Sequence, residues 1–533
     1  MTVWAGHVTI NFLPDDDLLE ISMDTPSGSR VIHRLDTSNA LQSHRVNSYN
    51  KRTYLCAISE TTALTMWAGR VTVNSLPEDV LLHIFYFDRL SFFDGLEEID
   101  RLQGLSWSWR RLVHVCRTWR SVIFASPTFL DLSLVCGPRT SVELTGSIWP
   151  PFPISIRDTL YRPMPENYDF DAAIEHHNRV YEIVLHHLKS LDLQRLASAM
   201  QKQFPALMHL MLAVDDGQAP VLPDGFLGGY SPRMQSFELD SIPFPALPKL
   251  LLSTTHLVRL SLWDIPHSGY ISPNAIVTCL STLTSLEELT LEFQSPQIFL
   301  DQARRYLQPL KRFVLPALIE FRFQGVCEYL NDLVAHIDAP QLNKLSIIFF
   351  NDIVFDTPQL VHFIGRIPTF SALKKAHLVF SDIMAWIHFS SETSGYGGLD
   401  VEIYCREFDW QISSLQQICT LSLSLLSKLE DLYIHEETDS QLDWQRDIEN
   451  SLWLELLHPF TAVKNLYLSD EFAHLIVPAL QELVGVSVTE LLPTLQNIFL
   501  EGFQPSIFVQ EGVRDFIARR QTFGHRIAVS RWE

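Results

Sequence analysis

A short pattern of apolar and polar positions recurs along most of the chain. It consists of an apolar residue, two variable residues, and then an apolar, a variable and an apolar residue. The copies are LKSLDL at Leu188, LMHLML at Leu207, MQSFEL at Met234, LVRLSL at Leu257, LEELTL at Leu286, LIEFRF at Leu318, LNKLSI at Leu342, LKKAHL at Leu373, LEDLYI at Leu429, VKNLYL at Val463 and LQNIFL at Leu495. Successive copies begin 19 to 34 residues apart, except for one interval of 56 that could hold a degenerate copy near Leu399.

Each copy predicts a strand with one apolar face, and its first apolar residue is expected to pack under the preceding turn. The stretches between copies, such as 274–286 and 357–370, carry helical apolar spacing. One strand and one helix cannot bury their own apolar faces, so neighbouring units must stack. The pattern therefore predicts a curved solenoid with a parallel sheet on its concave side over residues 186–533.

A different, helical pattern occupies residues 74–134. Pro77 is followed by two acidic residues, which is typical of a helix start. The first predicted helix carries its apolar stripe at Val80, Leu81, Ile84 and Phe85. A second helix is indicated by the apolar residues of 112–116, and a third over 116–125 ends before Ser126-Pro127. Residues 89–109 form an acidic, aromatic insert between the first two helices.

The start of this helical module occurs twice. WAGHVTINFLPDDDLLEI over 4–21 matches WAGRVTVNSLPEDVLLHI over 67–84 at twelve of eighteen positions, and only the second copy continues into an apolar segment. A truncated duplicate and a leader upstream of a true start at Met66 are both compatible with this. We predict a disordered leader over 1–65, a helical module over 66–135, a linker or cap over 136–185 and the solenoid from 186.

The composition argues against binding to nucleic acid, zinc or membranes. The chain is 47% hydrophobic with a formal net charge of -22, so a large core is expected and a polyanion such as nucleic acid is a poor partner. The seven scattered cysteines include no CxxC pair, which argues against a zinc site or a disulfide framework. No apolar run reaches the roughly 20 residues of a membrane span. We expect a protein of the cytoplasm or nucleus that binds neither nucleic acid nor membrane.

Catalytic chemistry is not indicated. His176, His177, His186 and His187 form two pairs that could approach each other on one helix, but ordinary surface histidines explain them better than zinc does. Cys116 lies two residues from His114, a spacing that points the two side chains apart on a helix. No nucleophile, metal-protease or nucleotide motif occurs. We therefore predict no catalytic residue, no metal site and no cofactor, and a protein that is not an enzyme.

Two segments of the helical module resemble an F-box. They are LPEDVLLHIF from Leu76 and LVHVCRTWRSVIFASPTFLDLSL from Leu112, and the repeats that follow resemble the leucine-rich-like arrays of fungal F-box proteins. The fold class that this implies is α/β, with a small N-terminal helical F-box followed by an irregular leucine-rich-repeat solenoid that carries a curved parallel sheet. The 89–109 insert departs from the compact F-box pattern.

The resemblance implies a binding role. Such proteins dock a Skp-family adaptor, and through it a cullin, as the substrate receptor of a ubiquitin ligase of the Skp–cullin–F-box type. The adaptor-binding positions that it implies here are Leu76, Pro77, Leu81, Ile84, Phe85, Val115, Cys116 and Trp119. The alternative is that the same residues pack only the core of the module, and for Cys116 and Trp119 the two roles overlap. The target protein would bind the repeats, and its identity cannot be read from them.

Two other functions are compatible with the sequence. A leucine-rich scaffold with a degenerate F-box would bind proteins without coupling them to ubiquitination. A hydrolase or transferase on an α/β core would need a motif that we do not find. The acidic total favours a target with a basic surface only if the acids gather on one face of the repeats.

Overall fold

A computed structural model describes most of the repeats and part of the N-terminal module. The described residues are 8–13, 18–24, 30–36, 77–91, 112–126, 130, 132–137, 152–158, 164–165, 168, 170–296, 312–350, 357–391, 397–420, 425–437, 448–483, 487–501 and 506–532. The chain divides into two compact units. Unit 1 comprises Met1–Val135 with Gly146–Pro153, and unit 2 comprises Cys136–Thr145 with Ile154–Glu533.

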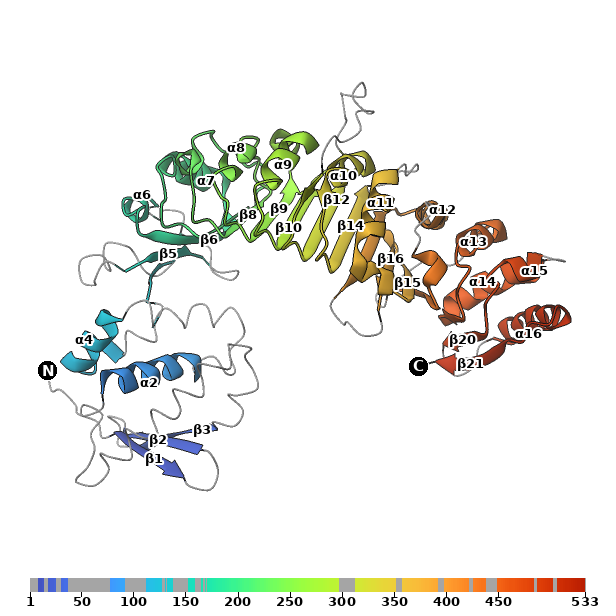
Figure 1. Ribbon diagram of the computed structural model, residues 1–533, viewed down its shortest axis with the longest axis horizontal. Coiled ribbons are helices and arrows are strands. Elements are labelled where there is room, and N and C mark those ends of the chain that lie inside the picture. Colours follow the sequence, from blue (N-terminus) through green and yellow to red (C-terminus); the bar gives the residue numbers. More distant parts are fainter. Residues whose placement is uncertain are drawn as a thin grey trace. The chain divides into compact units, whose positions relative to one another are not determined.

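Unit 2 is built on one long sheet (Figure 1). The strand order within unit 2 is β21-β20-β19-β18-β15-β16-β17-β14-β12-β10-β9-β8-β7-β6-β5, and most of β4 belongs to unit 1. The bounds are β4 Leu134–Cys136, β5 Ile154–Arg157, β6 Val180–Leu188, β7 His209–Val214, β8 Ser236–Asp240, β9 Arg259–Ile265, β10 Glu288–Phe293, β12 Glu320–Gly325, β14 Lys344–Phe350, β15 Lys375–Phe380, β16 Met384–Ser390, β17 Gly398–Tyr404, β18 Asp431–Glu436, β19 Asn465–Leu468, β20 Asn497–Glu501 and β21 Ala528–Trp532. A separate pair joins β11 Phe313–Val314 to β13 Ile337–Asp338.

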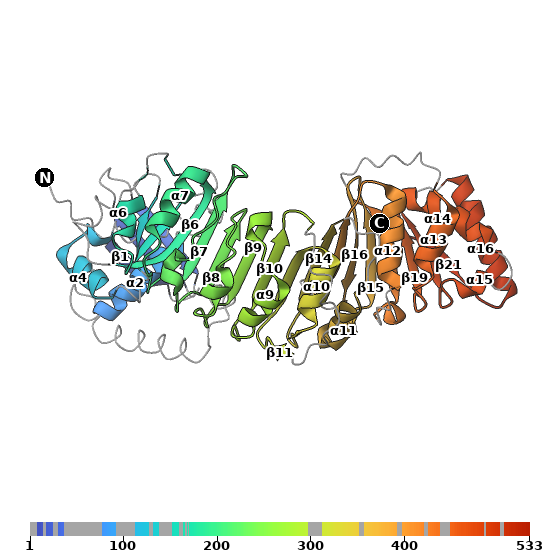
Figure 2. The ribbon, with the colours of Figure 1, turned by 90° about the horizontal axis from the view of Figure 1, so that it is seen from above.

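Helices follow most strands of unit 2 and lie along one face of the sheet, as Figures 1 and 2 show. They are α6 Phe170–Ile174, α7 Ser190–Ala199, α8 Leu247–Leu251, α9 Pro273–Leu280, α10 Cys327–Val334, α11 Pro358–Arg366, α12 Phe408–Thr420, α13 Asn450–Leu457, α14 Asp470–Glu482, α15 Ser487–Glu490 and α16 Ile507–Thr522, with 3₁₀ turns at Phe226–Gly229, His267–Gly269, Pro368–Ala372 and Leu426–Lys428. The helices predicted over 274–286 and 357–370 are therefore present in shorter form, as α9 and α11.

The two faces of the sheet differ sharply in burial. The apolar residues that point toward the helices are almost completely buried, and they include Leu210, Phe237, Leu260, Leu289, Phe321, Leu345, Leu399, Leu432, Leu466 and Ile498. The residues that alternate with them are mostly half-buried and mostly polar or aromatic. Because successive strand residues point to opposite faces, the alternation leaves one face of the sheet without a layer of helices from unit 2. We call this the open face.

Ten of the eleven sequence copies form the predicted strands. From the copy at Leu207 onward, each strand begins two residues after the first apolar residue of its copy. That first residue is buried in every case, as in Leu257 and Leu342, neither of which is exposed at all. The parallel solenoid predicted from the repeats is therefore present.

The copy at Leu188 is a wrong prediction. Leu188 ends β6, and the rest of the copy lies in α7, where Leu193, Leu196 and Ala197 are buried at helical spacing. The sheet also begins before residue 186, because β5 and most of β6 lie in the segment predicted as a linker or cap. Apolar residues three apart fit a helix as well as this repeat, so pattern alone could not separate the two.

The long interval between copies contains an inverted insertion. Chain order is β14, β15, β16, β17, but β17 pairs with β14 in parallel and β15 pairs with β18. After β14 the chain leaves two positions of the sheet empty and forms β15 in the third. It then turns back and fills the two positions with β16, which is antiparallel to its neighbours, and β17, which holds the degenerate copy at Leu399. Gln411 of α12 secures this excursion, because its buried Nε2 donates to the carbonyls of Ser381 (2.9 Å) and Cys405 (2.7 Å).

Unit 1 contains two of the predicted helices. They are α2 Glu78–Ser91 and α4 Arg117–Ala125, and residues 112–113 are also helical. Within the predicted leader, β1 Val8–Leu13, β2 Leu18–Asp24 and β3 Arg30–Asp36 form an antiparallel sheet. Most of 1–65 and of the 89–109 insert lies outside the described residues, so the prediction of a disordered leader is not tested.

Candidate functional site

The open face of unit 2 carries three rows of side chains that run across the strands. Parallel strands contribute their first, second and third outward-facing residues to the first, second and third row. The first row lies at the strand starts and contains His209, Ser236, Arg259, Glu288, Glu320, Lys344, Lys375, Asp431, Asn465 and Asn497. The second row contains Glu238, Ser261, Thr290, Arg322, Ser346, Asp400, His388, His377, Tyr433, Tyr467 and Phe499. The third row contains Asp240, Trp263, Glu292, Gln324, Ile348, Glu402, Trp386, Val379, His435, Glu501 and Trp532.

The first row is internally paired. Arg259 Nη2 donates to Glu288 (2.8 Å), and Lys344 Nζ donates to Glu320 (2.8 Å). The hydrogen bond from Arg259 holds the pKa of Glu288 below its usual range. Farther along the array, Asn497 donates to Asn465, and Asn465 donates to Asp431. These groups satisfy one another, so the first row offers few free charges to a partner.

The second row contains an aromatic stack, which we define as His377, Tyr433, Tyr467 and Phe499. Ring centroids are 4.3 Å apart for His377 and Tyr433, 4.1 Å for Tyr433 and Tyr467, and 4.4 Å for Tyr467 and Phe499, and the ring planes of each pair are nearly parallel. Parallel in-register strands place these side chains at the strand spacing of about 4.8 Å, which suits ring stacking. Trp532 lies edge-on to Tyr433 and Tyr467 at 6.0 and 5.8 Å.

The imidazole that ends the stack is held neutral. Burial, then the neighbouring His435, His388 and Lys375, lower the pKa of His377 to about 4. The ring of His377 therefore behaves as a flat, uncharged member of the stack near neutral pH. Burial also raises the pKa of Tyr433, with a further contribution from its hydrogen bond with Tyr467. The stack is thus uncharged along its whole length.

The third row contains four carboxylates and three tryptophans among other side chains. Burial, followed by Asp400, raises the pKa of Glu402. Burial, followed by Glu436, raises the pKa of Glu501, and Glu436 also shares a hydrogen bond with Glu471 of α14. Each of these shifts means that removing the proton costs more here than in water, because no full counter-charge compensates it. The third row is therefore an acidic edge on the open face.

One carboxylate of the third row, that of Glu292, forms an ion pair. Arg322 donates to Glu292, and the centre of its guanidinium lies 5.3 Å from the centre of the Trp263 ring. The three side chains come from β12, β10 and β9, which are consecutive in the sheet. A guanidinium held between a carboxylate and an indole face gains from both charge pairing and cation–π attraction. The open face therefore contains one internal example of how it can hold a basic side chain.

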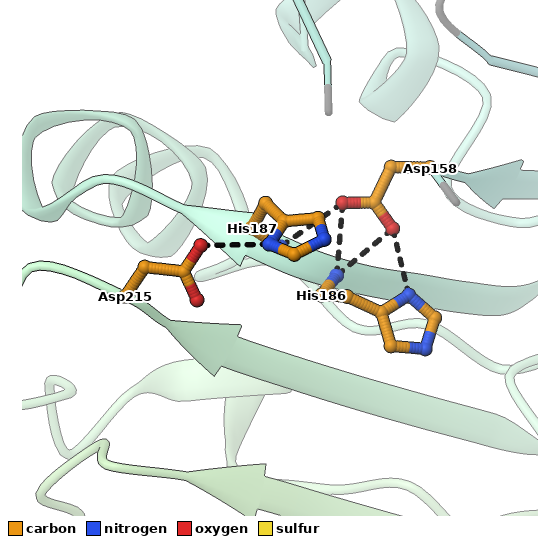
Figure 3. Close-up of polar contacts among 4 residues, drawn as sticks. All are labelled: Asp158, His186, His187 and Asp215. Carbon is orange, nitrogen blue, oxygen red and sulfur yellow. Dashed lines mark hydrogen bonds and ion pairs between the residues drawn. The ribbon is translucent and has the colours of Figure 1, made fainter. Parts of the chain in front are cut away.

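A cluster at the other end of the array joins Asp158, His186, His187 and Asp215 (Figure 3). Asp158 is buried and accepts hydrogen bonds from the backbone N–H groups of His186 (2.8 Å) and His187 (3.1 Å), and it also contacts His186 Nδ1 (2.9 Å). His187 Nδ1 contacts the exposed Asp215 (2.7 Å). The pairing register between β6 and β7 shifts here, between Leu185 and Leu188. The cluster anchors this irregularity, because Asp158 supplies acceptors for backbone groups that the ladder leaves unpaired.

The arrangement of the histidines corrects one sequence-based expectation. His176 and His177 lie in the turn after α6, whereas His186 and His187 lie on β6, so the two pairs do not share a helix. Among the described residues there is no group of three or more His, Cys, Asp or Glu side chains that could hold a metal ion. Likewise, no helix in the described part of the chain is long and apolar enough to cross a bilayer.

The predicted adaptor-binding residues divide by burial. Leu81, Phe85 and Trp119 are buried, and the rings of Phe85 and Trp119 lie 4.7 Å apart at the contact of α2 with α4. Helix α4 begins at Arg117 because Cys116 Sγ accepts the N–H of Trp119 (3.4 Å) as its N-cap. Pro77 and Val115 are exposed, Ile84 and Cys116 are half-buried, and Leu76 lies outside the described residues. Adaptor contact at these positions stays a prediction.

The three rows were not predicted from the sequence, although aromatic residues in three successive copies indicated part of the second row. Tyr433, Tyr467 and Phe499 occupy the variable position between the last two apolar residues of three successive copies. An aromatic residue at that position in consecutive repeats predicts a stack on the open face. Trp386 and Glu402 lie on strands of the inverted insertion, and nothing in the repeat pattern indicates that they become neighbours.

The sheet order, with strands joined through helices on one face, defines a solenoid of repeats of the leucine-rich kind. No family model matches the chain, and no curated protein matches it. Among solved structures, the chain is similar to the leucine-rich repeat-containing protein LegL7 from Legionella pneumophila, at 14% identity over 62% of this chain and 90% of that one, with a TM-score of 0.24. A similarity this weak does not support a common fold, so the repeat assignment rests on the strand order and register described above.

Proposed function

We propose that this chain is a protein-binding adaptor, in which the repeat array holds a target and the helical module docks a Skp-family adaptor of a cullin ubiquitin ligase. The observation that carries the first half is the open face. A long sheet with one face sealed by helices and the other lined by half-buried rings and charges is suited to binding an extended surface.

The second half rests on the helical module. The F-box resemblance of LPEDVLLHIF and LVHVCRTWRSVIF is supported by α2 and α4, which pack through Phe85 and Trp119. The exposed Pro77 and Val115 and the half-buried Ile84 are then the side chains free to contact a partner. Val115, whose exposed fraction is 53%, is a large apolar residue in water and the best single candidate for an anchor.

A pull-down of the purified full chain with a recombinant Skp-family adaptor tests the ligase role. The variants are Leu76→Ala/Pro77→Ala, at the Leu-Pro start of the F-box resemblance, and Val115→Glu, at an exposed position. Ser121→Glu, on the exposed side of α4, is the matched control for a new negative charge. We expect wild type and Ser121→Glu to bind and the other two variants to lose at least tenfold in affinity.

If folded wild-type chain shows no binding, the ligase role is wrong and the alternative scaffold with a degenerate F-box takes its place. Equal loss in Ser121→Glu and Val115→Glu would show that added charge, not a specific anchor, weakens binding. Circular dichroism of each variant verifies that the helices are retained.

A further inference from the structure

The three tryptophans of the third row share one arrangement. Each has a carboxylate on the neighbouring strand: Trp263 beside Glu292, Trp386 opposite Glu402, and Trp532 opposite Glu501. The first pair holds Arg322 of this chain. For the other two pairs, no lysine or arginine of the described chain lies at ion-pair distance from the carboxylate. Arg322 is near enough to affect the charge of Glu402 but does not bond it.

The two pairs without a cation flank the aromatic stack. In the sheet order, Glu402 on β17 and Glu501 on β20 are separated by β16, β15, β18 and β19, which carry Trp386 and most of the stack. Both tryptophans are half-buried, and the indole of Trp532 is fixed by a hydrogen bond from Nε1 to the carbonyl of Leu468 (3.3 Å). The result is an apolar strip with a carboxylate at each end, in which Trp386 pairs opposite Glu402 and the indole of Trp532 lies against Tyr433 and Tyr467.

We propose that this strip binds an extended segment of a partner protein that carries two basic side chains, preferably arginine, one at each Trp–Glu pair. This deepens the proposed function and rests on it, because it specifies the chemistry of the target that the repeats hold. The argument is charge complementarity on an uncovered sheet face. Arg322 supplies the internal geometry that each partner cation reproduces, and the stack receives the aliphatic stems between them.

The spacing of the two cations follows from the sheet. Five strand spacings of about 4.8 Å separate Glu402 from Glu501, which is about 24 Å, or about seven residues of an extended chain. The raised pKa values of Glu402 and Glu501 agree with the proposal, since a bound guanidinium would supply the counter-charge that both carboxylates lack. Binding is therefore expected to weaken in acid, as these carboxylates take up protons.

Selection of a phage-displayed random dodecapeptide library on the immobilised full chain tests this. We expect enriched peptides to carry Arg or Lys at two positions about seven apart. The affinity of a synthetic selected peptide, measured by fluorescence anisotropy, is expected to fall at least tenfold in Glu402→Gln/Glu501→Gln and in Trp386→Ala/Trp532→Ala. The double variant Glu455→Gln/Glu511→Gln removes the same charge from exposed positions on α13 and α16 and is expected to change affinity less than twofold.

Three results would overturn the inference. They are enrichment without basic residues, loss of affinity in the helix-side control equal to that in Glu402→Gln/Glu501→Gln, and full affinity in the tryptophan variant. The test is separate from that of the ligase role. If basic peptides are selected but the Skp-family adaptor does not bind, only the ligase role is refuted. If the adaptor binds but no basic peptides are selected, only this inference is refuted.

Discussion

At the scale of single residues, the structure depends on a few buried polar groups whose partners come from distant segments. Asp158 and the backbone of His186 are 28 positions apart, yet the carboxylate sits within hydrogen-bond distance of the strand irregularity. His377 is half-buried, and it is likewise surrounded by residues from three strands. Such groups are satisfied only in the folded chain, so changing them tests the fold directly.

Replacing Asp158 with Ala is expected to destabilise unit 2 by roughly 2 to 4 kcal/mol, because two backbone N–H groups then lose their acceptor in a largely dry environment. The measurement is the shift in the urea unfolding curve followed by circular dichroism. Asp215→Ala is the control, because its ion pair with His187 is exposed and contributes about 1 kcal/mol or less. Equal destabilisation by the two changes would contradict the anchoring role of Asp158.

His377 gives a pH prediction. Its folded-state pKa of about 4 lies below the ordinary value of 6.5, so the unfolded chain binds the proton first as the pH falls. The free energy of unfolding should therefore decrease between pH 6.5 and about 4. His377→Phe keeps a flat ring beside Tyr433 and should lose part of this decrease. His525→Phe, at an exposed position, should keep it, and identical pH profiles for wild type and His377→Phe would refute the assignment.

At the scale of elements, the helices determine how closely repeats stack. Gly512 of α16 faces α14, and a Cβ at this position would lie 2.3 Å from Val477 Cγ1. Val477 is fully buried and β-branched, so it has little room to move. The glycine is therefore required by the helix contact and not by backbone conformation.

Gly512→Ala is expected to destabilise the protein by about 1 to 3 kcal/mol, since overpacking outweighs the gain in helix propensity. Gly365→Ala in α11 is the opposite case, because nothing lies within 4 Å of the added Cβ. It should stabilise by up to about 1 kcal/mol. The measurement is the change in midpoint temperature of thermal unfolding for each variant. If Gly512→Ala raised that temperature, α14 and α16 would be able to move apart at little cost.

At the scale of the whole molecule, unit 2 behaves as a one-dimensional array whose two ends differ from its middle. The last strand, β21, pairs only with β20, and most of its residues are exposed. Strand β12, in the interior of the sheet, is paired on both sides. Stability in such arrays falls toward the ends, because a terminal unit has one neighbour instead of two.

Hydrogen exchange should reveal this gradient. We expect amides of β21 to exchange at least tenfold faster than those of β12, measured by mass spectrometry on peptides covering 528–532 and 320–325. Binding of a basic segment across β16 to β21 should slow exchange in β21 and leave β12 unchanged. Equal exchange in the two strands of the free protein would mean that the array opens as a single cooperative unit.

The sequence by itself determined where ten strands of the long sheet lie and which of their residues face the helices. Alternation of apolar residues is local information, and ten of eleven copies formed strands at the same offset from their first residue. The failure at Leu188 has a local cause too, since Leu193 of the copy and the following Leu196 and Ala197 satisfy helical spacing and are buried in α7. The adaptor-binding residues were inferred from resemblance, and the tertiary structure adds which of them are exposed.

Only the tertiary structure decided the order of strands and therefore the site. Periodicity indicates that a strand has an apolar face, but it does not indicate which neighbour it pairs with. The inverted insertion brings Trp386 beside Glu402, and parallel stacking aligns Tyr433, Tyr467 and Phe499, which are 34 and 32 residues apart in the sequence. Open-face side chains are free of the core's packing requirement, so their chemistry appears only when the sheet sets them in rows.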